Sequence, residues 1–106
     1  MSKSRTITKL TPVHPGEILK DELDAAGISL NALSRALHVP MNRISHIVNG
    51  KRGITADAAL RLGRLFGTSA ELWMNLQKNY ELRVARDAVE KQIEREVTAF
   101  AEMTHP

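Results

Sequence analysis

Residues 29–53 read SLNALSRALHVPMNRISHIVNGKRG, the pattern of two short helices joined by a tight turn at His38-Val39-Pro40. Ser29 is a suitable N-cap for the first of these helices. No acidic residue occurs between Asp24 and Asp57. The same interval holds four cations, Arg35, Arg43, Lys51 and Arg52. Such an excess of one sign of charge favours an anionic partner.

The second of the two helices is predicted to run from Met41 to Val48 and to bury one face. At about 100° per residue its apolar side chains gather on one side; these are Ile44, Ile47 and Val48. Asn42, His46 and Asn49 lie opposite, flanked by Arg43 and Ser45. Amide and cationic groups without a carboxylate are what a reader of the DNA major groove needs. Asn42 and His46 are therefore the predicted base readers.

Length and composition predict one small all-α domain. The chain has 106 residues, few aromatics, no cysteine and a net charge of +3. The absence of cysteine excludes disulfides and thiolate metal sites, and the four histidines have no metal-site spacing, so we expect no cofactor. No apolar run is long enough to span a bilayer, and the basic N-terminus lacks the apolar core of a signal peptide. We expect a cytoplasmic protein with no membrane partner.

Turn and cap residues predict the remaining elements. Pro15 suits the first turn of a helix that Gly27 ends. Ala36, with Leu33 and Leu37, is predicted to face inward from the next helix. Thr55 is expected to cap a fourth helix that ends at Gly67, and the internal Gly63 suggests a close helix–helix approach. Residues 68–71, TSAE, have capping-box spacing and start a fifth helix.

These elements predict three segments. Residues 1–12 form a basic flexible arm, in which a strand at 6–8 is expected only if something pairs with it. Residues 13–83 form the helix–turn–helix domain, and residues 84–106 form a helical tail.

The tail changes the phase of its apolar pattern. A second set of apolar side chains, which we call the apolar stripe, follows the face of the fifth helix that enters the core; it consists of Leu82, Ala85, Val89, Ile93, Val97 and Phe100. Either one continuous helix turns this stripe away from the core, or the helix breaks near residues 81–84 and a sixth helix follows. The cover of the stripe is either this chain's own core or a second subunit.

The segment LSRALHVPMNRISHIVNGK (33–51) resembles the helix–turn–helix of the lambda/434 repressor class. PVHPGEIL, NRIS, NGKRGIT, ALRLGRLFGTSAELWMNLQ and YEL together resemble the HigA-type antitoxins of that class, over roughly residues 11–83. The resemblance implies an all-α fold of five or six helices, a lambda-repressor-like domain with a C-terminal helical extension. It also implies a non-enzymatic bacterial homodimer that binds a palindromic operator at its own promoter. Its partner would be a HigB-type toxin, a ribosome-dependent mRNA endonuclease of RelE-like fold.

Carried over by position, the resemblance assigns base reading to Pro40, Met41, Asn42 and His46. It assigns phosphate contacts near Leu30, Asn31, Arg43 and Asn49. Ser45, which flanks the outer face, and the two loop cations, Lys51 and Arg52, are added to the predicted backbone contacts. His38 stands where the class has a glycine with positive φ, and Pro40 replaces the usual Ser or Thr N-cap.

Two other functions stay open at this point. One is a solitary transcriptional regulator without a toxin. The other is a pure toxin inhibitor with weak DNA binding, because Pro40 and Met41 leave fewer polar base contacts. Such toxins are usually basic, so an acidic surface is expected to bind them. The favoured surface is on the first helix, at Glu17, Asp21, Glu22 and Asp24; Glu90, Glu94 and Glu96 in the tail are the alternative.

Overall fold

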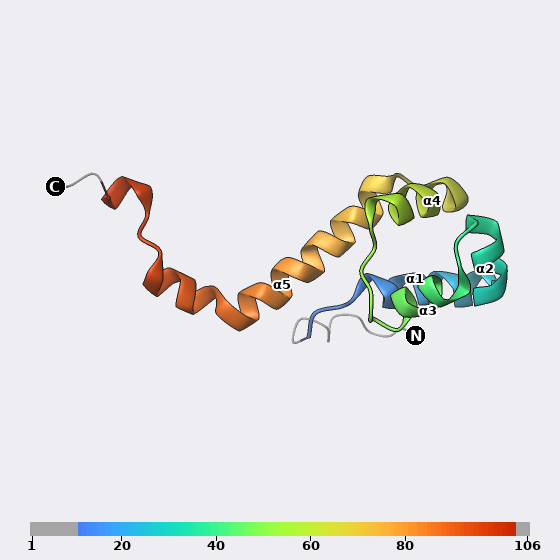
Figure 1. Cartoon of the computed structure of the whole chain (residues 1–106), viewed down its shortest axis with the longest axis horizontal. Helices are drawn as coiled ribbons and strands as arrows, with labels where there is room; N and C mark the ends of the chain where they lie inside the picture. The colour runs from blue at the N-terminus through green and yellow to red at the C-terminus, as the bar shows by residue number, and fades with distance from the viewer. Residues whose placement is uncertain (1–10, 104–106) are drawn as a thin grey trace.

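The computed structural model describes residues 11–103, which form five α-helices and one 3₁₀ turn (Figure 1). The elements are α1 (Pro15–Ala26), α2 (Leu30–Leu37), α3 (Met41–Val48), α4 (Ala56–Phe66), α5 (Ala70–Glu96) and η2 (Phe100–Glu102). The described part contains no strand, which confirms the all-α prediction. No helix in it is both long and apolar enough to cross a bilayer. The arm of residues 1–10, including the strand considered at 6–8, lies outside the described residues.

The core lies among the first four helices and the beginning of α5. Each helix contributes a narrow apolar face, and the connecting segments add Val39 and Ile54. The buried apolar residues are Leu19, Leu23, Leu33, Leu37, Val39, Ile44, Ile47, Ile54, Ala58, Ala59, Leu62 and Trp73. The prediction for Ala36 is wrong, because this side chain is exposed. Leu33 and Leu37, one turn apart, fill the narrow buried face of α2, so Ala36 is left at its solvent edge. It borders a groove together with Leu60 and Leu65, which are also exposed.

Side-chain caps define most helix starts. Ser29 accepts a hydrogen bond from the Ala32 amide, and Thr55 accepts one from the Ala58 amide, as predicted. The capping box at residues 68–71 is wrong by one residue, since the N-cap of α5 is Ser69, which accepts from the Leu72 amide. The Thr68 hydroxyl instead accepts a 3.0 Å hydrogen bond from the indole Nε1 of the buried Trp73. Satisfying this buried donor takes precedence over the box pattern.

The turn between α2 and α3 is fixed by its backbone and by α4. His38 has φ 59° and ψ 47°, the left-handed conformation that the glycine of related turns adopts more easily. The Ser34 hydroxyl donates to the Val39 carbonyl, and Arg61 Nη1 donates to the Leu37 carbonyl at 2.8 Å. α3 then begins at Met41, and its N-cap residue, Pro40, provides no side-chain cap, as the sequence predicted. Bonds from outside the turn therefore hold the angle between the two helices.

A glycine sets the distance between α1 and α3. A Cβ atom on Gly16 would lie 1.9 Å from the carbonyl oxygen of Ile47, so only glycine permits this approach. Gly63 has a similar but looser role, because a Cβ there would lie 3.0 Å from the Thr68 carbonyl oxygen. The prediction of an approach between two helices is therefore wrong in its partner, because Gly63 lies against the backbone of the turn, Thr68 and Ser69, and against only the first residue of α5, Ala70.

The fifth helix, α5, does not break near residues 81–84 but continues through Glu96. Figure 1 shows that it bends within its second half. The first half of α5 packs against α4 and α1. Residues 84–96 are all exposed, and the long tail gives the described chain extents of 62 × 32 × 23 Å. The described core therefore does not cover the apolar stripe. The boundary expected near residue 83 lies inside this helix, so the division into domain and tail stays a prediction.

His14 joins α1 to α5. It is the N-cap of α1, and its Nδ1 accepts a 2.8 Å hydrogen bond from the Gly16 amide. Its ring contacts Tyr80 of α5 edge-on, with centroids 4.9 Å apart. Burial lowers the pKa of His14, because it penalises the charged form more than nearby Glu17 favours it. The cap also requires an unprotonated Nδ1.

We predict that His14 makes the protein less stable in mild acid. Its folded pKa is below the unfolded value of about 6.5, so its full contribution is present above that pH. The contribution decreases as the pH falls below about 6.5, because the unfolded chain then binds the proton more readily, with a slope of at most about 1.4 kcal/mol per pH unit. Urea unfolding of wild type and His14→Asn between pH 7.5 and 5 measures this. Asn keeps a cap acceptor but does not titrate, so equal slopes in the two proteins contradict the prediction.

Candidate nucleic-acid interface

The outer face of α3 is polar and open to solvent. Its exposed side chains are Met41, Asn42, His46 and Asn49, while Ile44 and Ile47 are buried on the other side. This orientation agrees with the one derived from the helical period. The surface offers amide and imidazole groups, whose donors and acceptors match base edges in the major groove. The role of each side chain in base reading stays a prediction.

Arg43 lies at the edge of this face and is engaged by α4. Its Nη2 donates to Thr55 Oγ1 at 3.1 Å and to Asp57 Oδ2 at 3.3 Å, and its side chain is 25% exposed. Asp57 also accepts from Arg61 Nε at 2.9 Å. The hydrogen bond from Arg61 and, to a smaller extent, the one from Arg43 lower the pKa of Asp57. Arg43 therefore braces α3 against the start of α4, and only its remaining surface faces outward.

The basic loop after α3 is held in place by its backbone. The amides of Lys51 and Arg52 both donate to the His46 carbonyl, at 2.8 and 3.1 Å, while both side chains are exposed. Two cations thus project from a fixed turn directly beside the open face of α3. This geometry suits contact with phosphates, which needs positive charge at a fixed position but no base-specific shape.

Gln77 of α5 anchors the end of that loop. Its Oε1 accepts a 2.7 Å hydrogen bond from the Ile54 amide, and its Nε2 donates to Glu81 Oε2 at 2.7 Å. A Cβ on Gly53 would lie 2.7 Å from Gln77 Nε2, so the loop approaches this side chain closely. Gln77 is itself buried.

The remaining predicted phosphate contacts lie around α3 and the start of α2. Asn49 Nδ2 donates to Ser45 Oγ at 3.3 Å, so these two side chains are joined on one edge of α3. Asn31 is exposed in the first turn of α2, and Pro40 is exposed at the start of α3.

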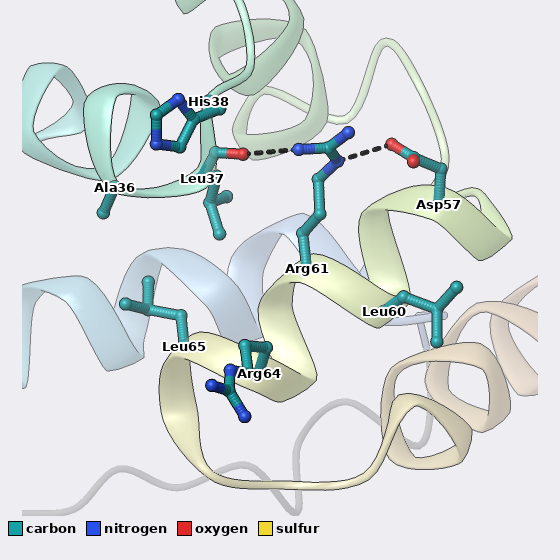
Figure 2. Close-up of a pocket in the computed structure, with 8 residues that line it drawn as sticks. All are labelled: Ala36, Leu37, His38, Asp57, Leu60, Arg61, Arg64 and Leu65. Atoms are coloured by element: carbon teal, nitrogen blue, oxygen red, sulfur yellow. Dashed lines mark hydrogen bonds and ion pairs between the residues drawn. The ribbon is translucent and has the colours of Figure 1, made fainter.

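A groove between the end of α2 and α4 lies beside this network (Figure 2). It has a volume of about 590 Å³ and is lined by Ala36, Leu37, His38, Asp57, Leu60, Arg61, Arg64 and Leu65. Figure 2 shows Arg61 bridging the Leu37 carbonyl and Asp57 across it. Because two of its donors are used in this way, Arg61 stabilises the turn before α3.

The acidic side chains of α1 face away from the core. Glu17, Asp21, Glu22 and Asp24 are all exposed. Asp24 pairs with Lys20 at 2.9 Å. Glu17 lies in the first turn, where its negative charge interacts favourably with the positive end of the helix dipole. Among the described residues of this face, four carboxylates accompany one lysine.

Sequence reasoning missed three residues that support the interface, namely His14, Arg61 and Gln77. One signal was available for Gln77, since it follows Trp73 by one turn on the buried face of α5 and is therefore a polar residue in an apolar pattern. Arg61 had no comparable signal, because an arginine on an exposed helix face looks the same whether or not it caps a distant carbonyl.

Comparison with known proteins gives consistent matches. The sequence pattern of a family described as helix-turn-helix matches residues 19–73. Virulence-associated protein I of Dichelobacter nodosus is 51% identical over 78 residues, covering 73% of this chain and 72% of that protein. The structure of the Pseudomonas aeruginosa antitoxin HigA with the higBA promoter is similar with a TM-score of 0.81 and 53% identity, covering 84% of this chain and 98% of that one. A HigA-family addiction module antidote protein from Coxiella burnetii has the same TM-score and coverage at 49% identity.

We predict that Gln77→Leu lowers the free energy of unfolding by about 1–3 kcal/mol, because the Ile54 amide loses its partner. Thermal unfolding followed by circular dichroism measures this, with an expected decrease in Tm of about 4–8 °C per kcal/mol. Asn75→Leu, an exposed position on the same helix, is the matched control and should change stability little. Similar values for the two variants would show that the Gln77 bond contributes little.

Proposed function

The chain belongs to the helix-turn-helix family that includes the HigA antitoxins, and on this premise we propose that it represses its own promoter and neutralises a toxin. The observation that supports DNA binding most directly is the acid-free outer face of α3, beside the two fixed cations of the following loop. The relative from Pseudomonas aeruginosa, whose structure was solved with the higBA promoter, has 53% identity to this chain. We infer that this chain places α3 in the major groove of its operator.

Each side chain then has a distinct role in recognition. The amide of Asn42 can form two hydrogen bonds with an adenine edge, and His46 offers a further donor or acceptor one turn away. Met41 contacts the methyl group of a thymine, and Pro40 packs beside it. Lys51 and Arg52 neutralise phosphates, with Asn31, Ser45 and Asn49 supplying neutral contacts to the backbone. Arg43 adds a phosphate contact while it keeps α3 fixed to α4.

We propose that the chain acts as a homodimer. One eight-residue helix reads too few base pairs to specify a site, whereas two copies related by a twofold axis read a palindromic operator. The half-sites would then be about 34 Å apart, one turn of DNA. The exposed apolar stripe is the surface that such a dimer would bury, since the described core leaves it uncovered.

We propose that the toxin is a RelE-like ribonuclease and that the acidic face of α1 binds it. A toxin that binds ribosome and mRNA is expected to be basic, and this face is net acidic on a rigid helix that packs against α3 and α5. The chain itself performs no catalysis in this proposal. It acts by covering the surface of the toxin.

We predict that Asn42→Ala weakens binding to the operator by about 1–3 kcal/mol and relaxes sequence preference at one position. Fluorescence anisotropy with the protein's own promoter and with random DNA measures both effects. Asn75→Ala, on α5, is the matched control. Unchanged operator affinity in Asn42→Ala would mean that α3 is not the reading helix.

Lys51→Ala is expected to act differently, and it separates backbone contacts from base reading. It should weaken binding to operator and random DNA alike and reduce the slope of log K against log salt by about 0.9 for each phosphate that is no longer neutralised. Lys78→Ala removes the same charge from α5 and should leave the slope unchanged. Weaker binding to the operator alone would contradict a phosphate role for Lys51.

We predict that reversing Asp21 and Glu22 to Lys slows association with the toxin and makes it more sensitive to salt, because the charges that steer the basic partner are reversed. Surface plasmon resonance with the RelE-like product of the neighbouring gene measures this. The same reversal at Glu90 and Glu94 tests the alternative acidic surface, and operator binding by the free protein should survive in the α1 variant. Wild-type association by that variant would exclude the α1 surface while leaving the antitoxin role intact.

A further inference from the structure

Asp57 places a carboxylate at the edge of the outer face of α3, a helix that contains no acidic residue of its own. It is the first acidic residue after Asp24 in the sequence, and it lies in the first turn of α4. Its Oδ2 is 3.3 Å from Nη2 of Arg43, which flanks the outer face. A carboxylate at this edge opposes the attraction of DNA phosphates, so its presence lowers the general affinity for DNA.

Two arginines share Asp57 unequally. Arg61 Nε donates to its Oδ2 at 2.9 Å from one turn further along α4, as Figure 2 shows. Arg43 Nη2 donates to the same oxygen at 3.3 Å and to Thr55 Oγ1 at 3.1 Å. The carboxylate therefore holds Arg43 less closely than it holds Arg61. When Arg43 moves away, Asp57 keeps an ionic partner on its own helix.

The pair with Asp57 compensates the charge of Arg43 in the free protein. The pKa of Asp57 is lowered, chiefly by the hydrogen bond from Arg61, so the carboxylate is ionised at neutral pH. An arginine that is bonded to an ionised carboxylate attracts a distant phosphate less than a free cation does. The pair is nevertheless easy to exchange, because the Asp57 side chain is 53% exposed and ion pairs at the surface contribute little to stability. A phosphate can replace the carboxylate, since it forms strong hydrogen bonds with a guanidinium.

Specific and non-specific DNA complexes differ in whether a phosphate reaches Arg43. Non-specific binding depends on exposed cations that meet phosphates without a fixed register, and Lys51 and Arg52 are such cations. When α3 is seated in the major groove, phosphates are instead held at fixed positions beside the helix. The Arg43 side chain is only 25% exposed at one edge of α3. A phosphate therefore competes with Asp57 for Arg43 mainly in the seated complex.

We propose that Asp57 is a specificity-determining residue. It keeps Arg43 from phosphates in the free protein and in non-specific complexes, and it releases Arg43 to a backbone phosphate when α3 is seated in the operator. Arg61 stays bonded to Asp57 throughout, so the released carboxylate is not left unpaired. This inference rests on the proposed binding of α3 in the major groove, and it assigns a role in discrimination to a residue that reads no base.

Asp57→Asn tests the proposal, because it removes the charge and keeps the size of the side chain. Fluorescence anisotropy with the protein's own promoter and with a random duplex of equal length gives the ratio of the two affinities. Affinity for random DNA should rise about five- to tenfold at 0.1 M salt, and the slope of log K against log salt should become steeper by about 0.9, since Arg43 then neutralises one more phosphate. Operator affinity should change less than about twofold, so the ratio decreases. Inactive protein affects both affinities equally and cancels in the ratio.

Asp24→Asn is the matched control. It removes the same charge from an exposed carboxylate that is paired with Lys20 on α1, and it should leave the ratio unchanged. A similar decrease in the ratio for both variants would overturn the role of Asp57, because net charge alone would then explain the effect.

Arg43→Gln separates release of Arg43 from direct repulsion of DNA by Asp57. Alone, it should weaken operator binding and flatten the operator slope by about 0.9, with little effect on random DNA. In the Arg43→Gln background, Asp57→Asn should change neither the ratio nor the slopes. An equal gain in random-DNA affinity with and without Arg43 would show that Asp57 acts by repulsion and would overturn the proposal. An unchanged ratio in Asp57→Asn overturns this inference alone, whereas a wild-type protein that does not prefer its own promoter overturns the proposed function as well.

Discussion

The contact between Gly16 and the Ile47 carbonyl is the constraint on which the presentation of α3 depends. α3 has eight residues and no side-chain cap, and an isolated helix of that length is not stable in water. It exists because Ile44 and Ile47 are buried and because α1 approaches its backbone where no side chain intervenes. His14 caps α1 beside that contact and packs against Tyr80 of α5. α1, fixed in this way to α5, therefore supports the buried side of α3.

Charged side chains have different roles at the inner and outer edges of α3. Asp57, the first acid after the acid-free interval, points toward Arg43 and Arg61 and joins α4 to the helices before it. These bonds pair the charges of Arg43 and Arg61 with Asp57 at the inner edge of the interface. Lys51 and Arg52 stay exposed at its outer edge. The result is a rigid scaffold with an outer face that attracts an anion without carrying a carboxylate. This arrangement suits DNA, whose phosphates supply affinity while the bases supply specificity.

The two halves of α5 have different surroundings. Trp73 and Gln77 in its first half are buried, and Gln77 ties the basic loop to the helix. Its second half has no described neighbour and shows an apolar stripe to solvent. Figure 1 shows that α5 leads its second half away from the described core, so the described residues leave the stripe uncovered; in the proposed homodimer a second copy covers it. In that proposal, one helix contributes both to the DNA-binding fold and to assembly.

The sequence by itself determined the helices, the orientation of α3 and the family, because helical periodicity, Ser29 and Thr55 caps and glycine stops act over a few neighbouring residues. It also predicted the left-handed His38 and the missing cap at Pro40. It placed Ala36 in the core incorrectly, because the width of the buried face of α2 depends on the helices that pack against it. It also placed the α5 cap at Thr68 instead of Ser69, because the Thr68 hydroxyl serves as the acceptor for the buried Trp73 indole. Only the tertiary structure decided the partners of Arg43, Arg61 and Gln77 and the continuity of α5, since each depends on distances between residues far apart in the chain.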